Sequence, residues 1–262
     1  MNVPIRMLGI ATTIFWIILA AFIASAAYSM KDLDFGVGEP QFTTTSSHDL
    51  MVTLPLFIDN RGFYSLKGFN LTTVFLDVED VEISRASSFL VVVPSGQNTS
   101  ILHNVTLSLN DMAERANQYL FGDTNLTCRV TAGLNFVEIV PTQLSANVTL
   151  PWGAPLYDFT LGQPTFNAAD PNHVTAKVPM SFENHAAFDL NGNVTARLFS
   201  GQDTLLGESQ TVAYAAKNMS YSGSLSFSVP ASSASAGNLS GHFEVYFSTT
   251  MFECGPVVIP YG

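Results

Sequence analysis

The side chains that could do chemistry are few and scattered along the chain. The five histidines (His48, His103, His173, His185 and His242) include no pair at the i,i+2 or i,i+4 spacing that places two imidazoles on one face of a strand or helix. None accompanies a glutamate in a zinc-binding H-E-x-x-H pattern, and no G-x-S-x-G or Cys-x-x-Cys motif is present. We therefore expect each histidine at a surface or loop position, and we predict no catalytic residue, no cofactor-binding residue and no metal site.

The densest group of polar side chains is acidic. Asp77, Glu79, Asp80 and Glu82 fall within the segment LDVEDVEI, and four carboxylates this close together could hold Ca²⁺ with the help of backbone oxygens. The alternative interpretation is a hairpin turn with a charged tip. We favour the hairpin, because a second copy of this stretch keeps the turn but only one acid, Asp203.

Cys128 and Cys254 are the two cysteines of the chain. They do not occupy equivalent places in the repeat described below, so a bridge between them would have to join two domains. An oxidising exterior would permit that bridge, but we expect two separate buried thiols.

A long apolar segment lies near the N-terminus. Residues 7–28 carry no charge, and at 1.5 Å per residue a helix of this length spans about 33 Å, enough for a bilayer core of about 30 Å. Arg6 precedes the segment, and the positive-inside rule then predicts a cytoplasmic N-terminus with everything after Tyr28 outside the cell membrane. A cleaved signal peptide is the alternative, since Ala24-Ser25-Ala26 is an A-x-A pattern. The apolar run is longer than usual for a signal peptide, so we favour a retained single-pass anchor in residues 1–29. Both interpretations export the rest of the chain.

Eight Asn-x-Ser/Thr sequons support export independently. Their abundance predicts a glycoprotein carrying N-linked glycans, although Asn-Val-Thr is also a common strand-edge sequence in a threonine-rich β protein. The net charge of −11, with no cluster of Lys and Arg, argues against a nucleic-acid partner. The candidate glycosylation sites are Asn70, Asn98, Asn104, Asn125, Asn147, Asn193, Asn218 and Asn238.

The chain contains a tandem repeat with an offset of 124 residues. The segment LDFGVGEPQF at 33–42 returns as YDFTLGQPTF at 157–166, and the register continues without a gap. An offset of this length indicates two copies of a whole domain. Further matched pairs are Pro55/Pro179, Asn60/Asn184, Leu66/Leu190, Gly68/Gly192 and Phe75/Phe199.

Each copy has the pattern of a β-sandwich. About seven short segments, separated by turn residues, alternate apolar and polar positions, as in Ser224 to Val229, which predicts antiparallel sheets with one face in water. We predict two tandem immunoglobulin-like or fibronectin-type-III-like sandwiches, at residues 30–150 and 156–262, joined by a stiff hinge at 151–155. Residues 110–121 of the first copy predict a short helix capped by Asn110 or Asp111, with a weaker counterpart at 230–237.

A family resemblance rests on the motifs PLFIDNRGFYSLKG at 55–68 and PMSFENHAAFDLNG at 179–192, together with the D-F-x-x-G-x-P opening of each copy. With these motifs, residues 30–262 resemble the type 2 late-embryogenesis-abundant family, whose unit is the water-stress and hypersensitive-response domain. The resemblance implies a fibronectin-type-III-like fold, an archaeal-type membrane-anchored tandem arrangement and no catalytic residues. This chain departs from the family where Arg61 and His185 replace the usual proline after the asparagine.

The expected function is non-enzymatic: a glycosylated spacer or binding module on the cell surface, held by its membrane segment. The alternative is a subunit of an extracellular filament or pilus-like assembly, which an extended, unpaired segment at 33–42 would favour. Phe63, Tyr64 and Phe188 follow the two matched asparagines and suggest either a recognition edge or caps on each sandwich core.

Overall fold

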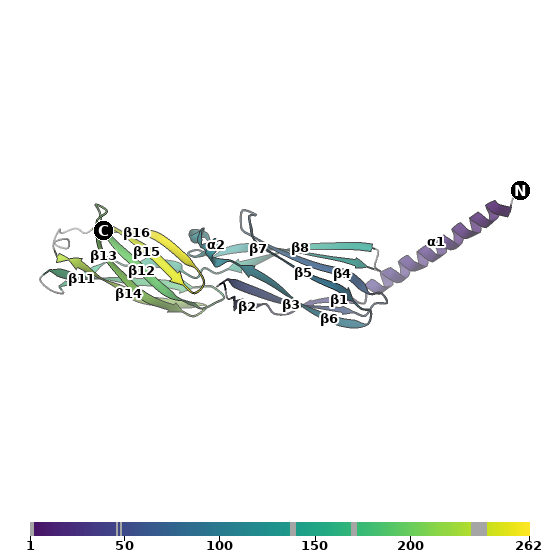
Figure 1. The fold of residues 1–262 in the computed structure, drawn as a ribbon, viewed down its shortest axis with the longest axis horizontal. Helices are drawn as coiled ribbons and strands as arrows, with labels where there is room; N and C mark the ends of the chain where they lie inside the picture. Colours follow the sequence, from purple (N-terminus) through teal and green to yellow (C-terminus); the bar gives the residue numbers. More distant parts are fainter. Residues whose placement is uncertain (1–2, 46, 48, 137–139, 169–171, 232–239) are drawn as a thin grey trace.

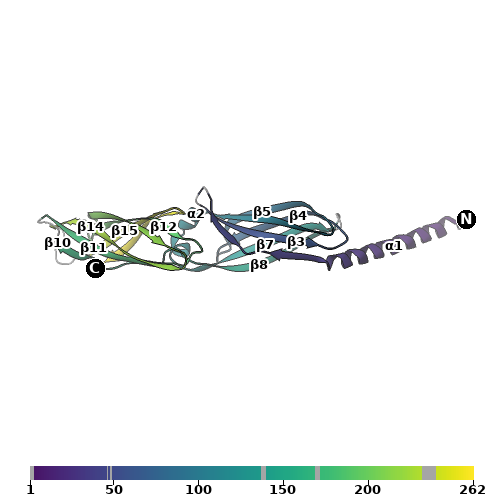
Figure 2. The ribbon, with the colours of Figure 1, turned by 90° about the horizontal axis from the view of Figure 1, so that it is seen from below.

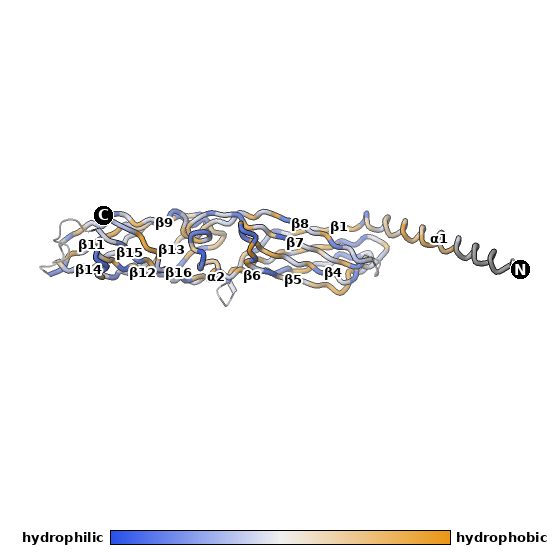
Figure 3. Tube along the Cα trace, turned by 90° about the horizontal axis from the view of Figure 1, so that it is seen from above, coloured by the Kyte–Doolittle hydropathy of each residue, from blue (hydrophilic) through white to orange (hydrophobic). Residues whose placement is uncertain are grey.

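The computed structural model describes residues 3–45, 47, 49–136, 140–168, 172–231 and 240–262. A long N-terminal helix, α1 (Val3–Met30), is followed by two β-sandwiches that lie end to end along one axis (Figures 1 and 2). The predicted all-β class, with two tandem sandwiches after one apolar helix, is confirmed. Figure 3 shows apolar residues along the described part of the helix and alternating with polar residues in the strands.

The first sandwich consists of two antiparallel sheets. In one sheet, β3 lies between β6 on one side and the two short strands β1 and β2 on the other; the second sheet has the order β5-β4-β7-β8. The strand bounds are β1 (Leu33–Val37), β2 (Gln41–Thr44), β3 (Leu50–Asn60), β4 (Leu66–Leu76), β5 (Glu82–Val93), β6 (Gln97–Leu107), β7 (Thr124–Phe136) and β8 (Val140–Trp152).

The second sandwich repeats this topology strand for strand. β11 lies between β14 and the short pair β9 and β10, and the other sheet has the order β13-β12-β15-β16. The repeat found in the sequence is therefore a repeat of the fold. The bounds are β9 (Tyr157–Leu161), β10 (Thr165–Ala168), β11 (His173–Asn184), β12 (Leu190–Ser200), β13 (Leu205–Ala215), β14 (Met219–Pro230), β15 (Gly241–Thr249) and β16 (Glu253–Tyr261).

Alternation along the strands forms the core. On β14, Leu225, Phe227 and Val229 are fully buried while the serines between them face water. Strands with this period of two leave one face of each sheet apolar, and the two apolar faces pack together. Burial of these faces removes apolar surface from water and is the main driving force of each sandwich.

The matched Gly-Pro pairs explain why the first strand of each sandwich is split in two. Gly38 donates its N–H to the carbonyl of Pro55 (2.7 Å), and Gly162 does the same to Pro179 (2.8 Å). Proline has no N–H to return, so the ladder is interrupted there, and the pairing register shifts by one residue between β1 and β2 and again between β9 and β10. A Cβ on Gly38 would lie 3.1 Å from Pro55, so the crossing leaves little room for a side chain.

The matched asparagines are buried at the ends of β3 and β11. The Asn60 amide nitrogen donates to the carbonyls of Tyr64, Val93 and Pro94 at 3.0–3.2 Å, and its side-chain oxygen accepts from Gly62 N–H. Each asparagine therefore fastens its own loop to the end of a strand in the opposite sheet. The Asn184 amide makes the matching contacts, donating to Phe188, Ala215 and Ala216 and accepting from Ala186.

The helical segment of the first copy differs from its prediction. Two short helices, α2 (Leu109–Ala113) and α3 (Ala116–Tyr119), replace the single helix expected over 110–121. The expected caps were wrong: Ser108 is the N-cap, accepting from Asp111 N–H (3.3 Å), whereas the Asn110 side chain accepts from Glu253 N–H in the second sandwich. Most of the weaker counterpart at 230–237 lies outside the described residues.

The buried Asn184 predicts a large stability cost on truncation. Asn184→Ala should lower the free energy of unfolding by about 3 kcal/mol, because several buried backbone groups lose their partner at about 1–3 kcal/mol each. Urea unfolding of the detergent-solubilised chain measures the change. Asn191→Ala, at an exposed asparagine of the next strand, is the control and should remain within about 0.5 kcal/mol of wild type. Equal effects of the two substitutions would contradict this role for Asn184.

Candidate functional site

Two equivalent loops organise the molecule along its long axis. We call residues 60–65 the Asn60 loop and residues 184–189 the Asn184 loop. The Asn60 loop contacts the end of helix α1: Phe63 N–H donates to Ser29 Oγ (2.8 Å), and Arg61 N–H donates to the Asp32 carbonyl (3.0 Å). Ser29 is buried there although it belongs to the apolar helix.

The Asn184 loop contacts the end of the first sandwich in a corresponding way. His185 N–H donates to the Ala154 carbonyl (2.9 Å), and Gly153 lies so close that a Cβ on it would fall 2.0 Å from the His185 carbonyl oxygen. Gly153 is offset from Ser29 by the same 124 residues as the rest of the repeat. In both copies the loop after the buried asparagine thus contacts the element that precedes its sandwich. This element is helix α1 in the first copy and the first sandwich in the second.

Apolar contacts continue the core across the junction between the sandwiches. The Phe121 ring lies 6.1 Å from that of Phe159 and 5.9 Å from that of Phe247, centroid to centroid. Leu156 N–H donates to the Leu120 carbonyl (2.9 Å), and both leucines are fully buried. The two sandwiches consequently share one continuous apolar cluster.

The segment between the sandwiches is fastened to the first of them. The Trp152 indole donates to the Tyr119 carbonyl (2.8 Å), and Ala154 N–H donates to Asp123 Oδ1 (2.8 Å). Pro151 and Trp152 belong to β8 itself. These contacts leave little freedom for bending at residues 151–155.

A histidine between two carboxylates completes the junction. His185 Nδ1 lies 2.8 Å from Asp123 Oδ2 in the first sandwich, and its Nε2 lies 3.0 Å from Glu183 Oε2. Hydrogen bonds to Asp123 and Glu183 raise the pKa of His185, and burial opposes them only in part. The ring also stacks on Tyr157 at 4.3 Å.

The acidic segment forms a hairpin turn between β4 and β5. Asp77 Oδ1 accepts from the N–H groups of Glu79 and Val81 (2.8 Å each), and its Oδ2 contacts Arg115 and Tyr119. Burial disfavours the Asp77 carboxylate, but these backbone donors and the Arg115 guanidinium outweigh it and lower its pKa. A cation here would compete with Arg115 for the same oxygen, and among the described residues no group of three potential ligands is placed for a metal.

The second sandwich keeps this turn with a different side chain. Ser200 Oγ accepts from the N–H groups of Gln202 and Thr204, and Asp203 has a positive φ (56°) close to that of Asp80 (60°). Glu79 and Glu82 have no acidic counterpart in the second turn, where Gln202 and Leu205 take their places, so these two acids are not needed to form it.

The expected surface position of His103 was wrong. His103 is fully buried on β6 and reaches across to the opposite sheet, where its two ring nitrogens lie 2.8 Å from Ser88 Oγ and 2.9 Å from Thr73 Oγ1. Burial lowers its pKa. The sequence contained the signal, because His103 alternates in step with Ile101, Val105 and Leu107 on the inward face of the strand.

The other histidines are dispersed. His173 is exposed at the start of β11. His242, on β15, stacks on Phe199 of β12 with ring centroids 4.9 Å apart. His48 lies outside the described residues. The structure therefore does not bring the described histidines together.

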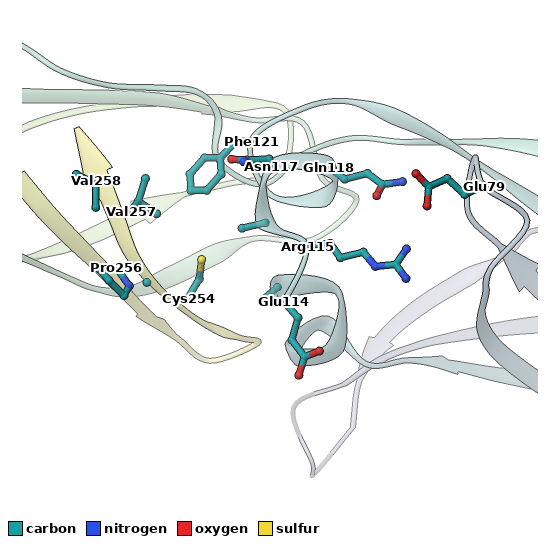
Figure 4. Close-up of a pocket in the computed structure, with 13 residues that line it drawn as sticks. Glu79, Glu114, Arg115, Asn117, Gln118, Phe121, Cys254, Pro256, Val257 and Val258 are labelled. Carbon is teal, nitrogen blue, oxygen red and sulfur yellow. The ribbon is translucent and has the colours of Figure 1, made fainter. Parts of the chain in front are cut away.

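An open cleft of about 770 Å³ lies between α2, α3 and the beginning of β16 (Figure 4). Arg115 and Gln118 line it from the first sandwich, and Cys254 from the second. The Gln118 amide nitrogen is buried without a hydrogen-bond partner in the described structure. Burial raises the pKa of the Cys254 thiol, which disfavours the reactive thiolate. This combination of groups lacks a paired base and nucleophile.

Both cysteines are free thiols. Cys128 is buried on β7, and Cys254 is half-buried on β16. Burial raises the pKa of Cys128 as well.

All seven sequon asparagines in the described residues are exposed. Asn104 and Asn147 lie on strands at opposite edges of the two sheets of the first sandwich, and Asn218 lies in a turn of the second. Glycans at these positions would meet no packed surface. Asn238 lies outside the described residues.

The aromatic residues after the two asparagines do not form one repeated edge. Phe63 is 63% exposed and stacks on Tyr28 of helix α1, whereas Ala187 takes its place in the second copy. Tyr64 hydrogen-bonds to Ser25, and Phe188 packs against the core of its sandwich.

Comparisons with known proteins add little about function. No protein-family model matches the chain, and no curated protein sequence matches it. Among solved structures, a transglutaminase from red sea bream is 18% identical over 87% of this chain and 31% of its own, with a TM-score of 0.31. The periplasmic chaperone SfaE is 9% identical over 87% of this chain and 98% of its own, with a TM-score of 0.28. This chain corresponds to less than a third of the transglutaminase chain, and these TM-scores carry no functional argument.

The pair of buried Asp77 and half-exposed Arg115 yields a prediction about the turn. Asp77→Asn should destabilise the chain by about 2 kcal/mol, less than a fully buried pair would cost because Arg115 remains half exposed. The lowered pKa means that the Asp77 contribution is present above its unfolded-state pKa of about 3.9 and is lost as pH falls through the folded value. The variant should accordingly lose less stability than wild type below pH 4 in chemical denaturation. Asp80→Asn, in the same turn, should have little effect; an equal loss would refute a specific role for Asp77.

The contribution of His185 to the stability of the chain depends on pH in the opposite sense to that of Asp77. Because the pKa of His185 is raised, its stabilisation is complete below the unfolded value of about 6.5 and is lost as pH rises through the folded value. The melting-temperature difference between wild type and His185→Gln should therefore shrink from pH 6 to pH 9.

A matched variant tests the cause. Asp123→Asn keeps the acceptor for Ala154 N–H but removes the charge beside His185, so it should weaken this pH dependence. If the melting-temperature difference from wild type were independent of pH for both variants, the His185 imidazolium would not be involved.

Proposed function

We propose that this chain is a non-enzymatic, membrane-anchored surface protein whose two sandwiches act as a stiff, glycosylated spacer or binding module. The observation that carries the proposal is the repeated loop contact, which fastens helix α1 to the first sandwich and the first sandwich to the second. Stiff coupling at both joints suits a protein that holds its far end at a set distance from the bilayer.

The helix supports the anchoring role. Thr13–Met30 is long and apolar enough to cross a membrane by length and composition, and nearly all of it is exposed. A soluble protein would not leave such a row of large apolar side chains in water. The retained anchor, with the sandwiches outside the cytoplasm, is part of the proposal, and the cleaved signal peptide is its alternative.

The spacing that the sandwiches provide follows from their strands. Eleven residues of β4 and eleven of β12 lie in successive sandwiches along the axis. At about 3.3 Å per residue the two strands together account for roughly 70 Å, before any loop is counted. The exposed sequons would place glycans along this length, shielding it from proteases.

A filament subunit is the second candidate. The segment at 33–42 does not favour donor-strand exchange, because β1 and β2 pair with β3 of their own sandwich. One observation does favour lateral assembly: edge strand β8 has no charged residue, and its core-facing Leu144, Val148 and Leu150 are exposed. Charges commonly protect edge strands from such association. The equivalent core-facing positions of β16, Val257 and Ile259, are half-buried.

Mass spectrometry of the chain purified from its native membrane tests the proposal. The expected result is an N-terminal segment retained through residue 28 and glycans on several sequons. Thr149→Ala should remove one glycan mass by deleting the Asn147 sequon, whereas Thr131→Ala on the neighbouring strand should remove none. A mature chain beginning near Ala27 without glycans would contradict the anchored glycoprotein. Negative-stain images showing filaments instead of separate rods would favour the second candidate.

A further inference from the structure

The last two turns of helix α1 lie side by side with the Asn60 loop of the first sandwich. Phe22, Ser25, Ala26 and Ser29 form the less exposed face of the last two turns, at the i, i+3, i+4, i+7 spacing of one helix face. The ring of Phe22 lies 6.2 Å from that of Tyr64, and Ser25 Oγ lies 2.5 Å from the Tyr64 hydroxyl. The Asn60 loop therefore lies beside residues 22–29 and not beyond them.

This overlap conflicts with a bilayer that ends below the loop. If the hydrocarbon core stopped before Phe22, only residues 7–21 of the uncharged run would remain, which is about 22 Å of helix. A bilayer core is about 30 Å thick. Tilting the helix would only shorten its reach, so a hydrocarbon core filled by uncharged residues alone has to extend over part of the overlapped segment.

The exposed side chains of this region suit the boundary between lipid and water. Phe63 stacks on Tyr28 with ring centroids 6.0 Å apart, and both residues are more than half exposed. Lys31 Nζ lies 3.7 Å from the centroid of the Tyr28 ring. Met30 is also exposed. Tyrosine is enriched at the membrane–water interface, and lysine serves there as an anchor, so Tyr28 and Lys31 suit the headgroup layer.

We propose that the tip of the first sandwich, the Asn60 loop with Phe63 and Tyr64, inserts into the headgroup layer of the bilayer. This inference rests on the proposed membrane anchor and deepens it: the sandwich contacts the membrane directly, and its partner there is the lipid interface. With the loop bonded to Ser29 and the lipid around Phe63, the rod has two attachments to the membrane, which restrict its tilt.

The repeat supplies a matched control for a direct test. Residue 63 corresponds to Ala187 in the second sandwich, an exposed position in the same loop but far from the helix. Phe63→Cys, Ala187→Cys and Ile18→Cys, each in a chain whose native cysteines are replaced by alanine, accept a nitroxide label one at a time. Circular dichroism checks that each labelled full-length chain remains folded in phosphatidylcholine–phosphatidylglycerol vesicles.

Collision of the labels with oxygen and with a water-soluble nickel chelate reports their depth. The label at 63 is expected to show an oxygen-to-nickel accessibility ratio several-fold above that at 187, between the values for 187 and for 18. A label at 63 as water-exposed as that at 187, with 18 inside the lipid, would overturn the loop insertion and leave the anchor standing; deeper burial of Arg6 would then make up the missing length. A water-exposed label at 18 would overturn the anchor and the loop insertion together.

Discussion

The structure depends on one buried side-chain amide in each sandwich. Asn60 and Asn184 each tie a loop to the end of a strand in the opposite sheet, with their oxygen and nitrogen both engaged. A buried amide with fewer partners would destabilise the fold by leaving polar atoms unsatisfied, so few other conformations are open to the loop. That rigid loop is the surface on which the preceding element docks, whether helix or sandwich.

The duplication consequently preserved joints and not reactive groups. The Gly-Pro crossings and the asparagine loops recur with the same hydrogen bonds, whereas the Asp77–Arg115 pair, buried His103 and both cysteines occur once. The groups that occur once serve packing or the junction: Asp77 fixes the turn beside α3, and His185 bridges the two sandwiches. In physical terms, the chain uses its polar side chains to resist bending, which agrees with the spacer proposed above.

Much of the architecture was predictable because it follows from period-two alternation and from turn residues that are local in sequence. The two sandwiches and the hairpin after Leu76 belong to this class, and helix α1 was predictable from its long uncharged apolar run. The position of His103 was predictable but missed, since the alternation of Ile101, His103 and Val105 puts all three on one face. The pairing of Asp77 with Arg115 and of His185 with Asp123 was not predictable, because tertiary packing brings these partners together and no local sequence signal marks them. The Asn110 cap failed for the same reason: its side chain accepts from Glu253, 143 residues away.

The central claim is that the two sandwiches form one stiff unit through the Asn184 loop. Electron–electron distance measurement between nitroxides at Ser87 and Gln210, exposed on the first and second sandwich, tests it most directly in the full-length chain in vesicles. The account predicts one narrow distance distribution, centred on the separation of these positions in the structure. A broad or multimodal distribution would show that the sandwiches move independently and would contradict the stiff spacer.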